Sequence, residues 1–260
     1  MQTINAFRGF RIILLLLVLF FVAGSDWIGR HRSLSWDAPI WVALYPINSD
    51  GTETVSNYIA SLERDHFSSV EQFFAREAKK FNLSLERPIR FRLADQISTL
   101  PPAVPQDANP IRVAWWSLKF RYWAWRHANY GSAAEVHLFL QYFDPKINPT
   151  LAHSFGLQKG RAGVVNLFAS RNMVGSNQVI IAHETLHTFG ATDKYDVGSG
   201  LPIFPSGYAE PNLRPLYPQR KAELMGGRKP LSEQRAAIPK RLHAVLIGPQ
   251  TASEIRWVKN

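Results

Sequence analysis

The residues best suited to chemistry in this chain are two histidines and two acids between positions 183 and 193. His183 and His187 are four residues apart, so on a helix they lie one turn apart on the same face. Imidazole nitrogens placed in this way can bind one metal ion at roughly 2.0–2.1 Å, the usual distance for zinc. Glu184 reaches the same side, where a base acting on a zinc-bound water must lie. The spacing therefore predicts a zinc site with a neighbouring general base.

The segment that carries these residues is expected to form an amphipathic helix. At about 100° per residue the two histidines and Glu184 fall on one side and the apolar residues on the other. Ser176 and Asn177 are candidate N-cap residues, and Gly190 follows the last apolar residue, where a left-handed residue often ends a helix. A turn there would bring Asp193 back toward the metal as a candidate third ligand.

Two alternatives to this interpretation remain open. In the first alternative, the third ligand is a downstream glutamate. The candidates are Glu210 and Glu223, which lie 23 and 36 residues after His187. In the other alternative the helix is only partly buried, and its histidines form hydrogen bonds with neighbouring groups and hold no metal.

The run from His183 to Asp193 has the form H-E-x-x-H-x-x-G-x-x-D. It resembles the active site of the metzincin clan of zinc metallopeptidases, whose extended motif has histidine at the last position. Small bacterial secreted proteases similar to snapalysin have aspartate there. The resemblance implies one zinc ion per chain, held by His183, His187 and Asp193, and hydrolysis of a peptide or protein substrate by a zinc-activated water with Glu184 as general base. It also implies a methionine-containing turn beneath the metal, for which Met225 in Glu-Leu-Met-Gly-Gly is the candidate.

The expected fold class is α+β: a metzincin-like domain with a twisted mixed sheet and an active-site helix. Hydrophobic patterns predict strands at 40–47, 88–93, 136–143 and 160–168, and helices at 55–62, 67–81 and from about 116. In the fold that the resemblance implies, an edge strand borders the substrate cleft. By that analogy, residues 163–168 are the expected edge, to which an extended substrate would add by main-chain hydrogen bonds.

Three tyrosines are candidates to donate a hydrogen bond to an oxyanion during peptide hydrolysis. They lie in or beside residues 196–218, which are rich in glycine and proline and are expected to form a long irregular loop. Such a loop in a compact domain is usually functional. The candidates are Tyr195, Tyr208 and Tyr217, and the sequence does not choose among them.

The N-terminus has the pattern of an export signal. Arg8 and Arg11 precede an apolar run at residues 12–23, and extending the run to Ile28 makes a marginal membrane span. The predicted division of the chain is a signal anchor or signal peptide at 1–29, a juxtamembrane linker at 30–38 and a metallopeptidase-like domain at 39–260. The arginines should stay cytoplasmic. We therefore expect a single-pass protein of the cell membrane with its catalytic domain outside the cytoplasm, or a secreted or periplasmic protein after signal cleavage.

Composition narrows the function further. The chain has 260 residues and a net charge of +10. It has no cysteine, which excludes disulfides, a thiol nucleophile and cysteine-ligated metal.

Two segments are rich in basic residues. Residues 211–260 hold ten lysines and arginines against three acids, and residues 111–130 interleave tryptophans with basic residues. The second stretch predicts a core helix or a membrane-surface helix. The alternative function is thus a non-catalytic exported basic module that binds a membrane surface or wall polymer, with structural or absent zinc. We expect a monomer, held to the membrane by its N-terminal segment, with no nucleic-acid partner.

Overall fold

A computed structural model describes residues 35–105, 109–129, 134–158 and 161–258 of the chain. The chain forms two compact units, Met1–Ser35 and Trp36–Asn260. The predicted signal segment at 1–29 lies outside the described residues, and no helix among the described residues is long and apolar enough to cross a membrane. The second unit begins within the predicted linker, because Trp36 is buried and its indole N–H donates to the carbonyl of Ile255 at 2.7 Å.

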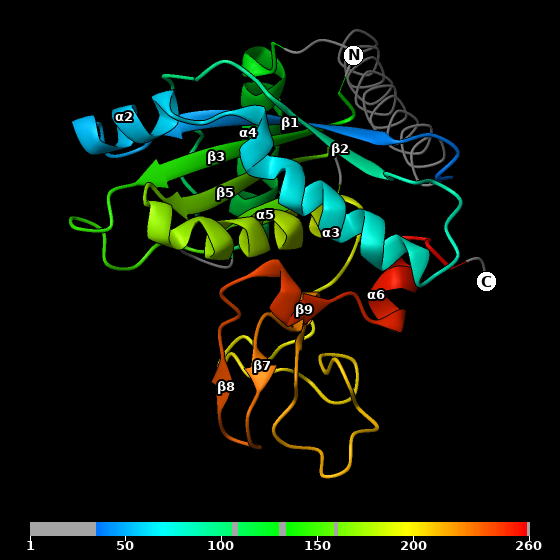
Figure 1. The fold of residues 1–260 in the computed structure, drawn as a ribbon. Helices are drawn as coiled ribbons and strands as arrows, with labels where there is room; N and C mark the ends of the chain where they lie inside the picture. Colours follow the sequence, from blue (N-terminus) through cyan, green and yellow to red (C-terminus); the bar gives the residue numbers. More distant parts are fainter. Residues whose placement is uncertain (1–34, 106–108, 130–133, 159–160, 259–260) are drawn as a thin grey trace, which may run out of the picture. The chain divides into compact units, whose positions relative to one another are not determined.

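A five-stranded mixed sheet forms the centre of the second unit, in the order β2–β1–β3–β5–β4 (Figure 1). Its strands are β1 (Ile40–Asn48), β2 (Ile89–Leu93), β3 (Val136–Phe143), β4 (Phe155–Leu157) and β5 (Ala162–Phe168). The strands β2, β1, β3 and β5 are parallel to one another, and β4 pairs with β5 in the antiparallel direction. The predicted α+β class with a mixed sheet is confirmed.

Helices cover both faces of this sheet, which is why β1 and β3 are apolar almost throughout. The helices are α2 (Glu53–Ala60), α3 (Ser68–Lys79), α4 (Pro110–His127), α5 (Val174–Thr188) and α6 (Pro249–Glu254). In Figure 1, α4 crosses behind the strands, and α3 and α5, which contact each other, lie below them.

The inner face of α4 packs on one face of the sheet. The register places Tyr45 of β1 beside Phe139 of β3, and Phe139 beside Val164 of β5, so these side chains form one row. The row is covered by the three aromatic residues that the sequence predicts on one side of this helix: Trp116, Phe120 and Trp123. The core prediction for this side of α4 is confirmed.

The helix α3 contains a buried acid in its apolar face. Glu77 accepts hydrogen bonds from Lys80 Nζ at 2.6 Å and from the backbone N–H of Ile247 at 3.2 Å. Burying a carboxylate is costly unless it is bonded in this way. Glu77 thus connects α3 to the C-terminal part of the chain.

The C-terminal part, residues 194–258, lies against α5 on the side away from the sheet (Figure 1). It contains only short elements: β6 (Ala222–Glu223), η4 (Leu224–Gly226), β7 (Lys229–Pro230), β8 (Ala236–Ala237), η5 (Leu242–Ala244), β9 (Val245–Leu246) and α6. Residues 196–218 contain no helix and no strand beyond isolated bridges, as predicted. The helix α5 therefore lies between the sheet and this irregular segment.

Candidate metal centre

The helix α5 starts earlier than the sequence predicts. Its N-cap is Met173, so the predicted caps Ser176 and Asn177 lie inside the helix. The Asn177 side chain instead donates to the carbonyl of Phe168 at 2.8 Å and accepts from its N–H at 3.3 Å. Asparagine has both a donor and an acceptor. Here both are used to attach the helix to the end of β5.

The C-terminus of α5 has the predicted glycine turn. Gly190 has φ +98°, its N–H donates to the carbonyl of His187, and the N–H of Ala191 donates to the carbonyl of Leu186. This pair of hydrogen bonds defines a Schellman motif, which needs a residue with positive φ. The turn reverses the chain directly after the helix and returns Asp193 to the side of the histidines.

Three potential ligand atoms converge at this point. The Nε2 atoms of His183 and His187 are 3.0 Å apart, and Asp193 Oδ1 lies 3.2 Å from each of them. A tetrahedral zinc ion with Zn–N bonds of roughly 2.0–2.1 Å has ligand atoms about 3.3–3.4 Å apart. The triangle formed by the three side chains is therefore close to the size that such an ion requires.

The outer nitrogens of both imidazoles are fixed by backbone carbonyls. Nδ1 of His183 lies 3.0 Å from the carbonyl of Leu224, and Nδ1 of His187 lies 2.8 Å from the carbonyl of Ala191. A carbonyl only accepts, so each Nδ1 donates and, in the neutral ring, each Nε2 presents a lone pair. Two lone pairs and a carboxylate oxygen then face one another, and this arrangement requires a positive charge between them.

The pKa shifts of His183 and Asp193 agree with a positive charge between these atoms. Burial lowers the pKa of His183, but the hydrogen bond with Asp193 and the charge of Glu184 outweigh it and raise that pKa to about 9. Burial raises the pKa of Asp193, yet hydrogen bonds from His183 and His187 hold it well below its ordinary value. The site thus attracts a cation, and a metal ion would take the place of the proton.

Glu184 lies beside this triangle with one oxygen unused. Its side chain is buried, and Oε2 has no hydrogen-bond partner among the described residues. The ligand atoms of Glu184, His183 and His187 lie within 4.8 Å of one another. Burial raises the pKa of Glu184, against the opposing charges of the two histidines. A buried carboxylate oxygen without a hydrogen-bond partner is unusual in a folded protein and is typical of an acid that acts on a bound group.

The candidate methionine turn packs against α5. Met225 is fully buried within η4, and the neighbouring carbonyl of Leu224 is the acceptor for His183. Glu223 accepts hydrogen bonds from the backbone N–H groups of Gly226 and Gly248 and from the hydroxyl of Thr251; sequence reasoning had not assigned it this role. These bonds fix the turn, and through Leu224 they fix the orientation of the His183 ring.

The two alternative third ligands use their carboxylates elsewhere. The oxygens of Glu223 are taken up by the bonds just described. Glu210 accepts from the backbone N–H of Arg220 at 3.1 Å and pairs with its guanidinium at 3.6 Å. The described structure therefore brings Asp193 to the histidines and engages Glu210 and Glu223 with other groups.

The three candidate tyrosines separate into two environments. Burial, the charge of Asp193 and a hydrogen bond with that carboxylate raise the pKa of Tyr195 to about 12. The hydroxyls of Tyr208 and Tyr217 lie 2.8 Å from each other. Among the described interactions of these tyrosines, only those of Tyr195 connect to the candidate ligands.

The expected substrate edge at residues 163–168 is covered by another strand over part of its length. These residues belong to β5, which pairs with β3 throughout, whereas β4 pairs only with Ala162–Val164. The strand at this edge of the sheet is β4, which was not predicted because it has only three residues. Short strands carry too few residues for a periodic pattern.

Gly156 of β4 lies directly against α5. A Cβ atom at this position would be 2.6 Å from the carbonyl oxygen of Glu184 and 2.8 Å from Cβ of His187. We expect Gly156→Ala to force β4 and α5 apart, lowering the free energy of unfolding by about 1–3 kcal/mol and weakening zinc retention. Denaturant unfolding with and without zinc measures both effects.

Gly198 is the matched control for this substitution. An added Cβ there meets only Asp196 Oδ1, at 3.5 Å, so Gly198→Ala should change stability by less than about 0.5 kcal/mol. Equal stability of the two variants would contradict the close packing of β4 on α5.

His153 is a further residue that sequence reasoning missed. It is exposed, and its charge lowers the pKa of Glu184, opposing the effect of burial. An isolated histidine outside any motif gives no sequence signal for such a role.

A search against models of known protein families and a search of curated proteins both found no match for this chain.

Proposed function

We propose that this chain is an exported zinc-dependent endopeptidase. The observation that carries the proposal is the convergence of His183 Nε2, His187 Nε2 and Asp193 Oδ1 beside Glu184, whose Oε2 has no hydrogen-bond partner among the described residues. Two imidazoles and a carboxylate suit zinc, and three protein ligands leave a fourth position open, which is the arrangement of a catalytic and not a structural zinc site.

The residues fit the groups that peptide hydrolysis needs. A bound zinc ion would supply a water of lowered pKa and polarise the substrate carbonyl. Glu184 would take a proton from the attacking water and deliver it to the leaving amine. Its raised pKa favours this double role, because the carboxyl group must hold the proton between the two transfers. Tyr195, which keeps its proton at neutral pH, would donate a hydrogen bond to the developing oxyanion.

The substrate would bind along β4. This strand forms one edge of the sheet, and through Gly156 it touches the backbone of Glu184 and the side chain of His187. An extended peptide added to that edge would have its main chain held beside the ligands. This arrangement favours an endopeptidase over a hydrolase of small molecules.

The metzincin resemblance remains part of the proposal. Strands followed by the motif helix, a glycine turn leading to the third ligand, and a buried methionine in a tight turn against that helix all agree with it. The N-terminal apolar run supports export, with the domain outside the cytoplasm and tethered or released.

Metal content is the direct test of the proposed function. The full chain, purified and dialysed exhaustively, should retain about one zinc per chain by elemental mass spectrometry. It should cleave an unfolded protein such as casein, lose this activity on chelation and regain it when zinc is restored. A folded chain that takes up no zinc and cleaves nothing would leave the histidine helix as a structural element only.

A further inference from the structure

The outer face of α4 has an apolar stripe that the described part of the domain leaves exposed. Its five side chains are between 51% and 80% exposed, although their spacing of four and three residues places them on one side of the helix. They are Ile111, Trp115, Leu118, Tyr122 and Trp125. The opposite side of the same helix is already buried against the sheet. Packing within the domain therefore does not explain why the outer side is aromatic.

The charge of α4 has a single sign. Its eighteen residues include no acid, whereas the basic residues are Arg112, Lys119, Arg121 and Arg126. Lys119 Nζ lies 5.6 Å from the ring centre of Trp115. Tryptophan and tyrosine with nearby lysine and arginine are the side chains that proteins place at the boundary between lipid headgroups and acyl chains.

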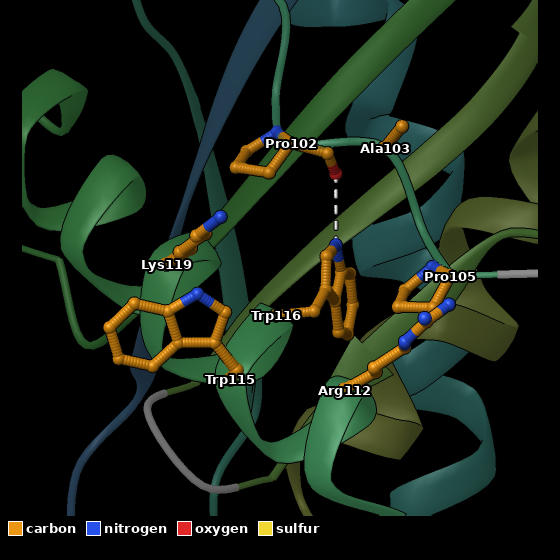
Figure 2. Close-up of a pocket in the computed structure, with 7 residues that line it drawn as sticks. All are labelled: Pro102, Ala103, Pro105, Arg112, Trp115, Trp116 and Lys119. Carbon is orange, nitrogen blue, oxygen red and sulfur yellow. Dashed lines mark hydrogen bonds between the residues drawn. The ribbon is translucent and has the colours of Figure 1, made fainter. Parts of the chain in front are cut away.

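A cavity of about 530 Å³ adjoins this stripe (Figure 2). Its apolar walls come from α4 and the proline-rich segment before it, and Arg112 and Lys119 supply its cationic groups. The indole N–H of Trp116 donates to the carbonyl of Pro102 at 3.0 Å and fixes that segment to the helix. Leu100 and Val104 of the segment are exposed as well. An apolar hollow with cations beside it fits an anionic headgroup and the first part of its acyl chains.

We propose that the outer face of α4, together with residues 100–105, binds the surface of an anionic lipid bilayer. Charge argues against the two other occupants. A second copy would bring two acid-free basic helices face to face, which is repulsive. The chain's own apolar run at residues 12–23 is preceded by Arg8 and Arg11 and followed by one acid, Asp26, so it offers α4 no net negative charge. An anionic bilayer supplies both the negative charge and the apolar layer that this face matches.

This contact would add to the expected N-terminal anchor. Twelve residues separate Ala23 from Trp36, a length of at most about 43 Å when fully extended. A domain tethered so closely meets the membrane at high effective concentration, so even a weak interfacial contact would be occupied. The bilayer would then hold the domain in one orientation. The inference does not depend on the proposed peptidase activity.

The test uses a spin label on the full chain reconstituted in vesicles. Because the chain has no cysteine, a cysteine introduced by Leu118→Cys takes the only label. In vesicles of phosphatidylcholine and phosphatidylglycerol, this label should be shielded several-fold from a water-soluble nickel chelate and should lie roughly 5–10 Å below the interface. A label introduced by Val197→Cys, at a residue 86% exposed in the irregular segment, should remain in water and serves as the control.

Charge reversal on the same face separates lipid binding from other causes of shielding. Lys119→Glu with Arg126→Glu should return the label at 118 to water without changing the unfolding transition or the cleavage of a soluble substrate. In vesicles of neutral phosphatidylcholine alone, the label at 118 should likewise remain in water when Lys119 and Arg126 are left unchanged. Equal exposure of the labels at 118 and 197 would overturn the proposal. Shielding that persists in neutral lipid, with spin–spin broadening that grows with protein density, would also overturn it and indicate a second copy.

Discussion

Glu184→Gln is expected to retain about one zinc per chain while lowering peptide hydrolysis by about 10²–10⁴-fold, the usual contribution of a general base. Glutamine keeps the size of the side chain but cannot take a proton. The two imidazoles and Asp193, which form the ligand triangle, are left in place. Zinc content by elemental mass spectrometry and initial rates on a quenched peptide, measured on the same preparation, test the two halves of this expectation.

Glu210→Gln is the matched control for that experiment. Glu210 is an acid of the same type in the C-terminal segment, and its carboxylate is bonded to Arg220. The control should keep both zinc and activity. If Glu184→Gln turned over substrate at the rate of the control, Glu184 would not be the base, and the water would have to be deprotonated by another group.

Asp193→Ala is expected to weaken zinc binding by more than about 100-fold. Loss of a residue that merely orients a ligand already costs about 10–100-fold, and Asp193 would contribute both a ligand atom and the only negative charge of the triangle. Competition with a chelator of known zinc affinity measures the change. Near-intact affinity would instead point to Glu210 or Glu223 as the third ligand.

Asp193→His provides a rescue variant for the same position. Imidazole is also a zinc ligand, so this variant should bind zinc more tightly than Asp193→Ala, although the longer ring must adjust the turn after Gly190. A variant no better than alanine would mean that Asp193 acts through its charge alone and not as a ligand.

The sequence by itself determined the features that depend on neighbours along the chain. The one-turn spacing of His183 and His187, the position of Glu184 and the positive φ of Gly190 are all local, because a helix and its C-terminal turn involve residues at most five positions apart. The apolar strands and the buried side of α4 followed from periodicity for the same reason.

Tertiary structure decided whatever depends on pairs of residues far apart in the chain. The carbonyl of Leu224 fixes the His183 ring across 41 positions, and no local pattern predicts that contact. The edge strand β4 was visible only through its pairing with β5, and Tyr195 was singled out only by its interaction with Asp193. Hydrophobic pattern indicates that a side chain prefers burial, but the available packing surfaces determine which side chains are buried. On α4 the sheet had room for one aromatic face, and the other was left exposed.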